Sequence, residues 1–278
     1  MSLRVFDYKI PGTKNKCDCQ PSLEYQNFES SYHNFKDDIH TLVKNNENKT
    51  FYKFTDGEYF WLTNHQVGSV SPGKRDSNVS DRDLTPFRDG VFKCDYHGMN
   101  LHPHDYENFK KIFNKEPDFL CDYVVGMVYN KWFTETFDGK IGLIGADVKL
   151  DLIKELCGKQ EYLDYLKFNG FTDYIKMPQR YLCDQIDYAD ELLEKQLSKS
   201  KSKIFLIGIG HAGMALMHRM QKYTDAIFIN VGSGICAYAG VQDNDRPYAA
   251  DWVNYQLNDF DYSKVDVWKN NMWNKKTI

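Results

Sequence analysis

The sequence predicts an α/β fold in which a Rossmann-like, mostly parallel sheet carries helices on both faces. One unit occurs twice, because a short apolar strand, a glycine turn and a helix follow one another at residues 140–158 and again at 203–223. The strands of both units are apolar without interruption, which is typical of parallel strands buried on both faces. The chain has 278 residues, enough for one large α/β domain. Ligands of such sheets bind at the carboxyl ends of the strands.

The N-terminal part is expected to begin with an irregular arm, because residues 1–26 hold two prolines, a glycine and several charges. At residues 27–44 apolar side chains recur with helical spacing, which predicts an amphipathic helix. Residues 50–54 are aromatic and predict a strand, which runs directly into an acidic triplet and an apolar segment suited to the first turns of a helix. We assign residues 27–278 to a single α/β domain.

A polar stretch at about 67–105 is expected to be a loop-rich insertion with one short helix near residues 81–87. A functional lid and a solvated insertion are equal alternatives for it. His97, His102 and His104 stand at its end, and an H-x-H pair on a strand can bind zinc. The proline between the last two favours a turn and the sequence completes no ligand set, so surface or capping histidines are the preferred interpretation.

Strands and helices continue to alternate through the second half of the chain. The sequence predicts a helix at 105–115, a buried strand or helix at 119–132, strands at 174–178 and 225–231, and a charged amphipathic helix at 184–198.

Composition narrows the classes of function. With a net charge of −4, nothing in the composition suggests broad electrostatic binding to nucleic acid or to anionic membranes. No apolar run approaches the roughly 20 residues that span a bilayer, and the N-terminus lacks the apolar region of a signal peptide. The cysteines number seven and are scattered, apart from Cys17 and Cys19. We therefore expect reduced thiols and a cytoplasmic protein.

The acidic triplet Asp56-Gly57-Glu58 is the first candidate for chemistry. Its glycine permits a tight turn, so both carboxylates can face one hard divalent cation, and such a cation could hold a diphosphate. Alternatively, Asp56 caps the following helix and Glu58 lies in its first turn, where the helix dipole favours an acid. The spacing alone favours this second interpretation.

A second candidate is the turn after the strand at 203–208, which fits the G-x-G-x-x-G pattern through Gly208, Gly210 and Gly213. Glycines there allow backbone N–H groups to approach a phosphate at a helix N-terminus, beside His211. A dinucleotide site also needs an acid at the end of the next strand, and that position is Asn230. In the alternative interpretation, the glycines only permit close packing of helix and strand.

The strand at 225–231 leads into a third candidate, a flexible loop with Gly232 and Ser233, whose N–H groups and hydroxyl could bind phosphate or sugar. Arg246 and Tyr248 follow, and the arginine suits bidentate pairing with a diphosphate. A surface ion pair of Arg246 with a neighbouring aspartate is an equal alternative.

Taken together, these motifs resemble the GT-D-fold glycosyltransferases. The KFTDGE segment at 53–58 is similar to R-F-G-D-G-E in that family, and Val231-Gly232-Ser233 and Arg246-Pro247-Tyr248 match its downstream segment. Gly210 matches the glycine of its strand–helix turn, and Pro178-Gln179-Arg180 resembles a proline-led stretch before a late helix. The chain departs from the family at Asn230 and at residues 235–237, where acids are usual, and at Thr55, where glycine is usual.

The resemblance implies a GT-D-like fold and a metal-dependent transferase. Asp56 and Glu58 would bind Mn²⁺ or Mg²⁺, which would hold the diphosphate of a nucleotide sugar. A UDP-sugar is the expected donor, and a glycan or glycoprotein is the expected acceptor. Because the family's acids are missing, the general base is open between Asp147, at a strand end, and His211, which could instead contact phosphate.

Two alternatives from other classes stay open. One is an NAD(P)-dependent oxidoreductase built on the glycine turn, against which the missing acid at Asn230 argues. The other is a non-catalytic nucleotide or sugar sensor, in which the acidic triplet only caps a helix.

Overall fold

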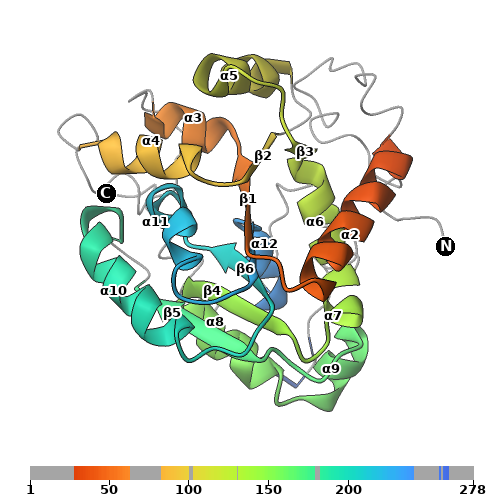
Figure 1. Ribbon diagram of the computed structural model, residues 1–278. Coiled ribbons are helices and arrows are strands. Elements are labelled where there is room, and N and C mark those ends of the chain that lie inside the picture. Colours follow the sequence, from red (N-terminus) through yellow and green to blue (C-terminus); the bar gives the residue numbers. More distant parts are fainter. Residues whose placement is uncertain are drawn as a thin grey trace, which may run out of the picture.

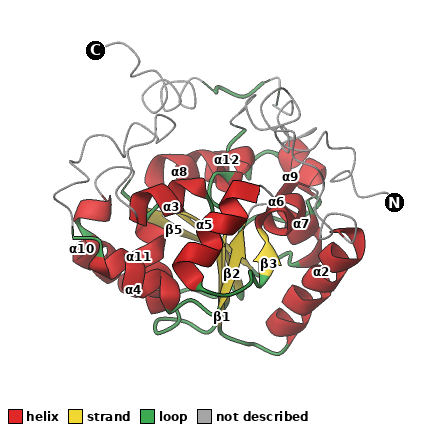
Figure 2. Ribbon diagram, turned by 90° about the horizontal axis from the view of Figure 1, so that it is seen from above, coloured by secondary structure: helices red, strands yellow, loops and turns green. Residues whose placement is uncertain are grey.

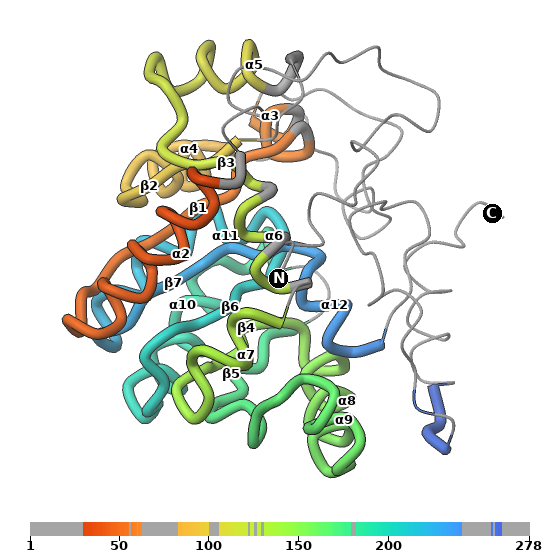
Figure 3. Tube along the Cα trace, turned by 90° about the vertical axis from the view of Figure 1, so that its right-hand side faces the viewer, coloured from red at the N-terminus to blue at the C-terminus, as the bar shows by residue number. Residues whose placement is uncertain are grey.

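A computed structural model describes residues 28–62, 83–99, 103–129, 131–178, 182–240, 257 and 259–262. Within them the chain forms one seven-stranded sheet in the order β3-β2-β1-β7-β6-β4-β5, and every pair is parallel. Figure 3 follows this order down the sheet, from β2 through β1, β7 and β6 to β4 and β5. The fold class predicted from the sequence is confirmed. The expected arm at 1–26 lies outside the described residues.

The strands are β1 (Lys49–Phe54), β2 (Tyr96–Met99), β3 (Phe119–Leu120), β4 (Ile141–Ala146), β5 (Asp173–Met177), β6 (Ile204–Gly208) and β7 (Ile227–Asn230). The helices are α2 (Phe28–Lys44), α3 (Asp56–Leu62), α4 (Thr85–Phe92), α5 (Pro103–Phe113), α6 (Cys121–Tyr129), α7 (Trp132–Thr136), α8 (Asp147–Leu156), α9 (Gln160–Leu166), α10 (Ile186–Leu197), α11 (Ala212–Met220) and α12 (Gly234–Tyr238), with a 3₁₀ turn, η4 (Leu182–Asp184). None of the described helices is both long and apolar enough to cross a membrane.

Helices cover both faces of the sheet, as Figures 1 and 2 show. On one face α11 packs between α4 and α10, and on the other α8 lies on β4 and β5 while α12 contacts β6 and α6. α11, which follows β6, therefore lies on one face of the sheet. The helices that follow the neighbouring strands β4 and β7, which are α8 and α12, lie on the other face. Connections that diverge in this way leave a crevice at the carboxyl ends of the strands, where ligands of open α/β sheets bind.

The strands are buried as their apolar sequences predict. Every residue of β4 and β7 is buried, and so are the first four of β6. Packing of this kind requires helices on both faces, because an exposed sheet face would alternate between apolar and polar residues.

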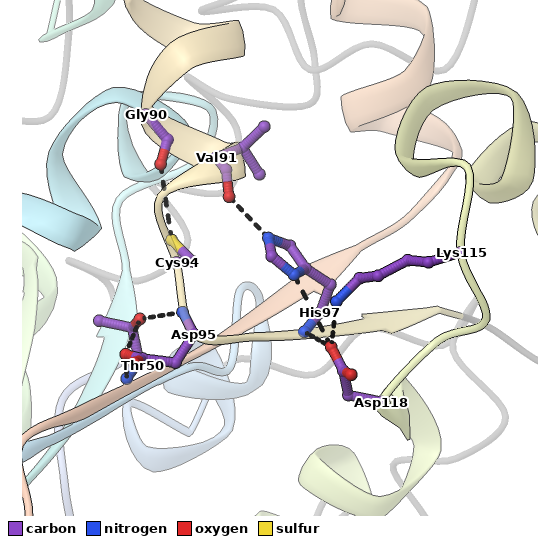
Figure 4. Close-up of polar contacts among 8 residues, drawn as sticks. All are labelled: Thr50, Gly90, Val91, Cys94, Asp95, His97, Lys115 and Asp118. Carbon is purple, nitrogen blue, oxygen red and sulfur yellow. Dashed lines mark hydrogen bonds and ion pairs between the residues drawn. The ribbon is translucent and has the colours of Figure 1, made fainter.

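Part of the stretch expected to be a loop-rich insertion belongs to the sheet. Residues 83–99 form α4 and then β2, which pairs with β1 on one side and β3 on the other. The expected short helix is present, at Thr85–Phe92. The start of β2 is fastened to β1 by Asp95, whose Oδ2 accepts hydrogen bonds from the Thr50 N–H (2.9 Å) and hydroxyl (2.8 Å) (Figure 4). Residues 63–82 lie outside the described part.

His97 is a buried residue of β2 and caps a helix end. Its Nε2–H donates to the carbonyl oxygen of Val91 in the last turn of α4, at 2.6 Å (Figure 4). Nδ1 lies 3.7 Å from an oxygen of Asp118, which also accepts hydrogen bonds from the His97 backbone N–H and the Lys115 ammonium. The capping interpretation is thus confirmed for His97, whereas the side chains of His102 and His104 lie outside the described residues.

Stability should fall as the pH is lowered from about 7 to 5. Burial lowers the pKa of His97, with Asp118 opposing, and burial and the adjacent Arg219 lower the pKa of His218 to about 4. The unfolded chain, with histidine pKa values near 6.5, binds protons in this range that the folded chain does not, and this difference favours unfolding. Urea midpoints at pH 7.5 and 5.5 would measure the effect. We expect the urea midpoint of His218→Gln to change less with pH than that of the wild type. An unchanged pH dependence would contradict the role of His218 in the loss of stability.

Candidate functional site

The structure brings three candidate motifs together at the carboxyl ends of β1, β7 and β6. Trp61, from α3, packs against His211 at the start of α11, and their ring centroids are 4.4 Å apart. Both side chains are buried. This contact places the helix of the acidic triplet against the glycine turn, although about 150 residues separate them in sequence.

The acidic triplet opens α3 with one half of a capping box, the bond of the Glu58 side chain to the Thr55 N–H. Thr55 precedes the helix, and the Glu58 carboxylate reaches back so that its Oε2 accepts hydrogen bonds from the Thr55 N–H (3.0 Å) and hydroxyl. The capping residue is therefore Thr55, and Asp56 is the first residue of the helix. The placement of Glu58 in the first turn matches the alternative interpretation of the triplet.

The same geometry is compatible with a cation. Both hydrogen bonds from Thr55 go to Oε2 of Glu58, so within the described residues Oε1 can still face a ligand, and Asp56 stands two residues away in the same turn. The side chain of Asp56 itself lies outside the described residues. Across the described ranges, no group of three His, Cys, Asp or Glu residues could hold a metal. A cation here would take its remaining ligands from water and substrate phosphates, as Mg²⁺ usually does.

The three glycines of the turn have different surroundings. A Cβ at Gly208 would lie 2.5 Å from Cγ2 of Ile235 and 2.8 Å from the carbonyl oxygen of Gly232, so this glycine permits close packing against the β7 loop and α12. Gly210 has a φ of +58° and open space where a Cβ would stand. Gly213 would make only an ordinary contact, 3.7 Å from the ring of Tyr52. Of the three, Gly210 is thus the one that exposes backbone to an approaching ligand.

The loop after β7 is stabilised by hydrogen bonds that its own backbone N–H groups donate. The N–H of Gly232, which has a φ of +53°, donates to Oδ1 of Asn230 at 2.9 Å and to the carbonyl oxygen of Ile207 at 3.1 Å. Asn230 is buried and thus fixes the turn. Ser233 follows as the cap residue of α12, and its side chain makes no capping hydrogen bond. The Gly232 N–H is therefore occupied within the loop, and the Ser233 hydroxyl stays the candidate for contact with a ligand.

The two candidate bases lie in different environments. His211 is 2% exposed beneath Trp61, and its ring packs between α3 and α11. Asp147 is half-exposed at the start of α8, and its Oδ1 accepts the N–H of Val148 at 2.7 Å. It follows β4, which lies three strand spacings from β1, or about 14 Å. Asp147 is thus on the far side of the crevice from Glu58.

Two residues near the site were given no role by the sequence, although one of them, Lys53, begins the KFTDGE segment. Lys53, on β1, lies against Gly232: a Cβ on that glycine would be 3.3 Å from Cε and 3.6 Å from Nζ of the lysine. Tyr52 has a fully buried phenol, and burial and then the Glu58 carboxylate raise its pKa. The signal for Lys53 is a charged residue inside a strand that is otherwise buried. Arg180, Arg246 and Tyr248 lie outside the described residues.

No protein-family model matches the chain, and no curated protein matches it. Among solved structures, a glycosyltransferase (DUF1792) from Streptococcus sanguinis is similar, with a TM-score of 0.49 and 8% identity over 84% of this chain and 95% of that one. A selenomethionine structure of domain of unknown function 1792 gives 0.48 and 12%, covering 82% and 91%. A third, described as having a distinct glycosyltransferase fold, gives 0.43 and 11%, covering 82% and 91%. The likeness is one of overall fold, and the activity has to follow from this chain's own residues.

Proposed function

We propose that the chain is a glycosyltransferase that uses Mn²⁺ or Mg²⁺ to transfer a sugar from a nucleotide diphosphate sugar to an acceptor hydroxyl. The contact between Trp61 and His211 carries the proposal, because it holds an acidic pair and an open glycine turn at one crevice. A diphosphate needs both a cation and hydrogen-bond donors, and neither motif supplies both. The expected donor is a UDP-sugar, the expected acceptor is a glycan or glycoprotein, and the expected compartment is the cytoplasm.

Asp56 and Glu58 would hold the cation, which would neutralise charge on the diphosphate leaving group. The N–H groups of Gly213 and Met214 at the start of α11 already donate to the carbonyl oxygens of Gly210 and His211. What α11 offers a phosphate is therefore the positive end of its dipole, which the exposed Gly210 lets the phosphate approach. A dipole fixed in this way stabilises charge as it develops, without reorganising. Ser233 would add a hydroxyl, and by the family resemblance Arg180, Arg246 and Tyr248 would complete the donor site.

Inverting transfer requires a base for the acceptor hydroxyl. Asp147 suits this role better than His211, because its carboxylate is half-exposed whereas the imidazole is buried under Trp61. The buried rings of Trp61 and His211 would keep water from one side of the reacting groups.

A nucleotide cofactor site of the oxidoreductase kind is less well supported. In such a site an acid after the second strand binds the ribose. Here that position is Asn230, and its Oδ1 is occupied by the N–H of Gly232.

The first test is a thermal-shift titration with UDP and UDP-sugars, with and without Mn²⁺. Saturation to about 100 times the Kd should stabilise the protein by about 2.7 kcal/mol. We expect a shift that needs both metal and diphosphate, followed by metal-dependent release of UDP from one of the sugars. A shift with NADH alone would instead indicate an oxidoreductase. UDP binding that is insensitive to chelator, without sugar release, would indicate a sensor.

A further inference from the structure

Lys53 stands in an unusual position for a charged residue. It lies on β1, which is a central strand paired with β2 on one side and β7 on the other. Phe51, Tyr52 and Phe54 on the same strand are buried, as expected for a parallel sheet covered on both faces. Lys53 is half-buried. Phe54 and then Thr55, the residue before α3, follow it in the chain. A lysine at this point places a cation at the carboxyl end of the sheet.

The amine of Lys53 is directed to the loops that form the crevice. Its Cε and Nζ lie 3.3 and 3.6 Å from where a Cβ of Gly232 would stand. The carbonyl oxygen of Gly232 in turn lies 2.8 Å from the Cβ position of Gly208. The ammonium therefore sits beside the β7 loop, which itself touches the glycine turn of β6. Neighbouring Tyr52 points to the opposite face, where its ring approaches Gly213, as strand alternation requires.

The backbone N–H groups of Val231 and Gly232 in the β7 loop are not free to bind an anion. Both hydrogen bonds of the Gly232 N–H are internal, to Asn230 and Ile207, and the Val231 N–H also donates to the Ile207 carbonyl oxygen. Because these amides are occupied, Lys53 is what brings a positive charge to the β7 loop within the described part of the chain. The amino end of α11 supplies positive potential at the neighbouring strand end. Positive groups at the ends of β1 and β6, the two strands that flank β7, suit an anion that spans the β7 loop.

We propose that Lys53 binds the diphosphate of the donor, across the crevice from the glycine turn. The inference rests on the proposed function, and it adds a residue of this chain to the diphosphate site. Lysine acts as a flexible point charge toward phosphate, so arginine should replace it in large part, whereas an uncharged side chain of similar length should not.

The test compares Lys53→Met with Lys53→Arg and with Lys49→Met. Lys49 lies on the same strand at the opposite edge of the sheet, where it pairs with Asp95, so the control removes the same charge far from the crevice. Isothermal titration calorimetry with UDP and with inorganic pyrophosphate, each in the presence of Mn²⁺, measures the affinity of each folded variant for the two probes. We expect Lys53→Met to bind both probes about 10- to 100-fold more weakly, as for loss of one hydrogen bond to a charged group. Lys53→Arg should recover most of the affinity, and Lys49→Met should bind like the wild type.

The outcomes separate this inference from the proposed function. Wild-type affinity of Lys53→Met for pyrophosphate would overturn the role of Lys53 and leave the transferase standing. Equal losses in Lys53→Met and Lys49→Met would also overturn it, because they would reflect net charge rather than a contact. If the wild type binds neither UDP nor pyrophosphate with Mn²⁺, the proposed function fails and the role of Lys53 fails with it.

Discussion

Glu58→Gln should reduce glycosyl transfer more than about 100-fold, since loss even of an outer-shell partner of a metal ligand typically costs 10- to 100-fold. The free energy of unfolding should hardly change. Glutamine can take the place of glutamate in a capping box, so its side-chain oxygen would still accept the Thr55 N–H. The substitution thus removes the charge that a cation needs and keeps the cap that α3 needs.

The matched control is Thr55→Ala, which removes the hydroxyl that now hydrogen-bonds Glu58. This variant should lose about 1 kcal/mol of stability with the hydrogen bond between the Thr55 hydroxyl and the Glu58 carboxylate. It should keep measurable Mn²⁺-dependent transfer, because both carboxylates remain. UDP release measured against Mn²⁺ concentration, with urea unfolding of each variant, distinguishes the two roles. Wild-type activity in Glu58→Gln would show that the triplet serves only as a helix cap.

Most of the sheet could be predicted from the sequence because its strands are apolar without interruption. β4, β6 and β7 stand out for this reason. A helix follows β4 directly at Asp147, and a short loop that contains a glycine leads from β6 and from β7 into the next helix. β2 does not stand out, since its four residues include His97 and Gly98 and lie in a polar stretch. Its place in the sheet depends on pairing with β1 and β3, which are distant in sequence.

The residues of the site could be predicted better than their roles. The pattern Thr55-x-x-Glu58 is a capping-box signal, yet our interpretation of the sequence placed the cap at Asp56, one residue too late. The packing of Trp61 on His211 could not be predicted, because it depends on how α3 and α11 meet in space. Local sequence likewise shows three similar glycines after β6, whereas their separate functions depend on what lies opposite each one.

Gly208→Ala should therefore destabilise the protein by about 3 kcal/mol, the upper end of the usual cost of overpacking. Its Cβ would lie 2.5 Å from Ile235 and 2.8 Å from a backbone oxygen of Gly232, and backbone cannot move aside as easily as a flexible side chain. The β7 loop would have to shift, so UDP binding should weaken as well. Urea unfolding and titration with UDP and Mn²⁺ would measure both effects.

Gly213→Ala is the matched control in the same motif. Its Cβ would meet Tyr52 at an ordinary 3.7 Å, and the residue lies in α11, where alanine is favoured over glycine by up to about 1 kcal/mol. We expect unchanged or raised stability and unchanged UDP affinity. Gly210→Ala should differ from both: its Cβ enters open space at a φ of +58°, so it should cost about 1–2 kcal/mol in backbone strain and weaken UDP binding without a packing clash. Equal effects at all three positions would mean that the motif acts as a single packing element, and the glycine turn would then lose its role in binding the donor.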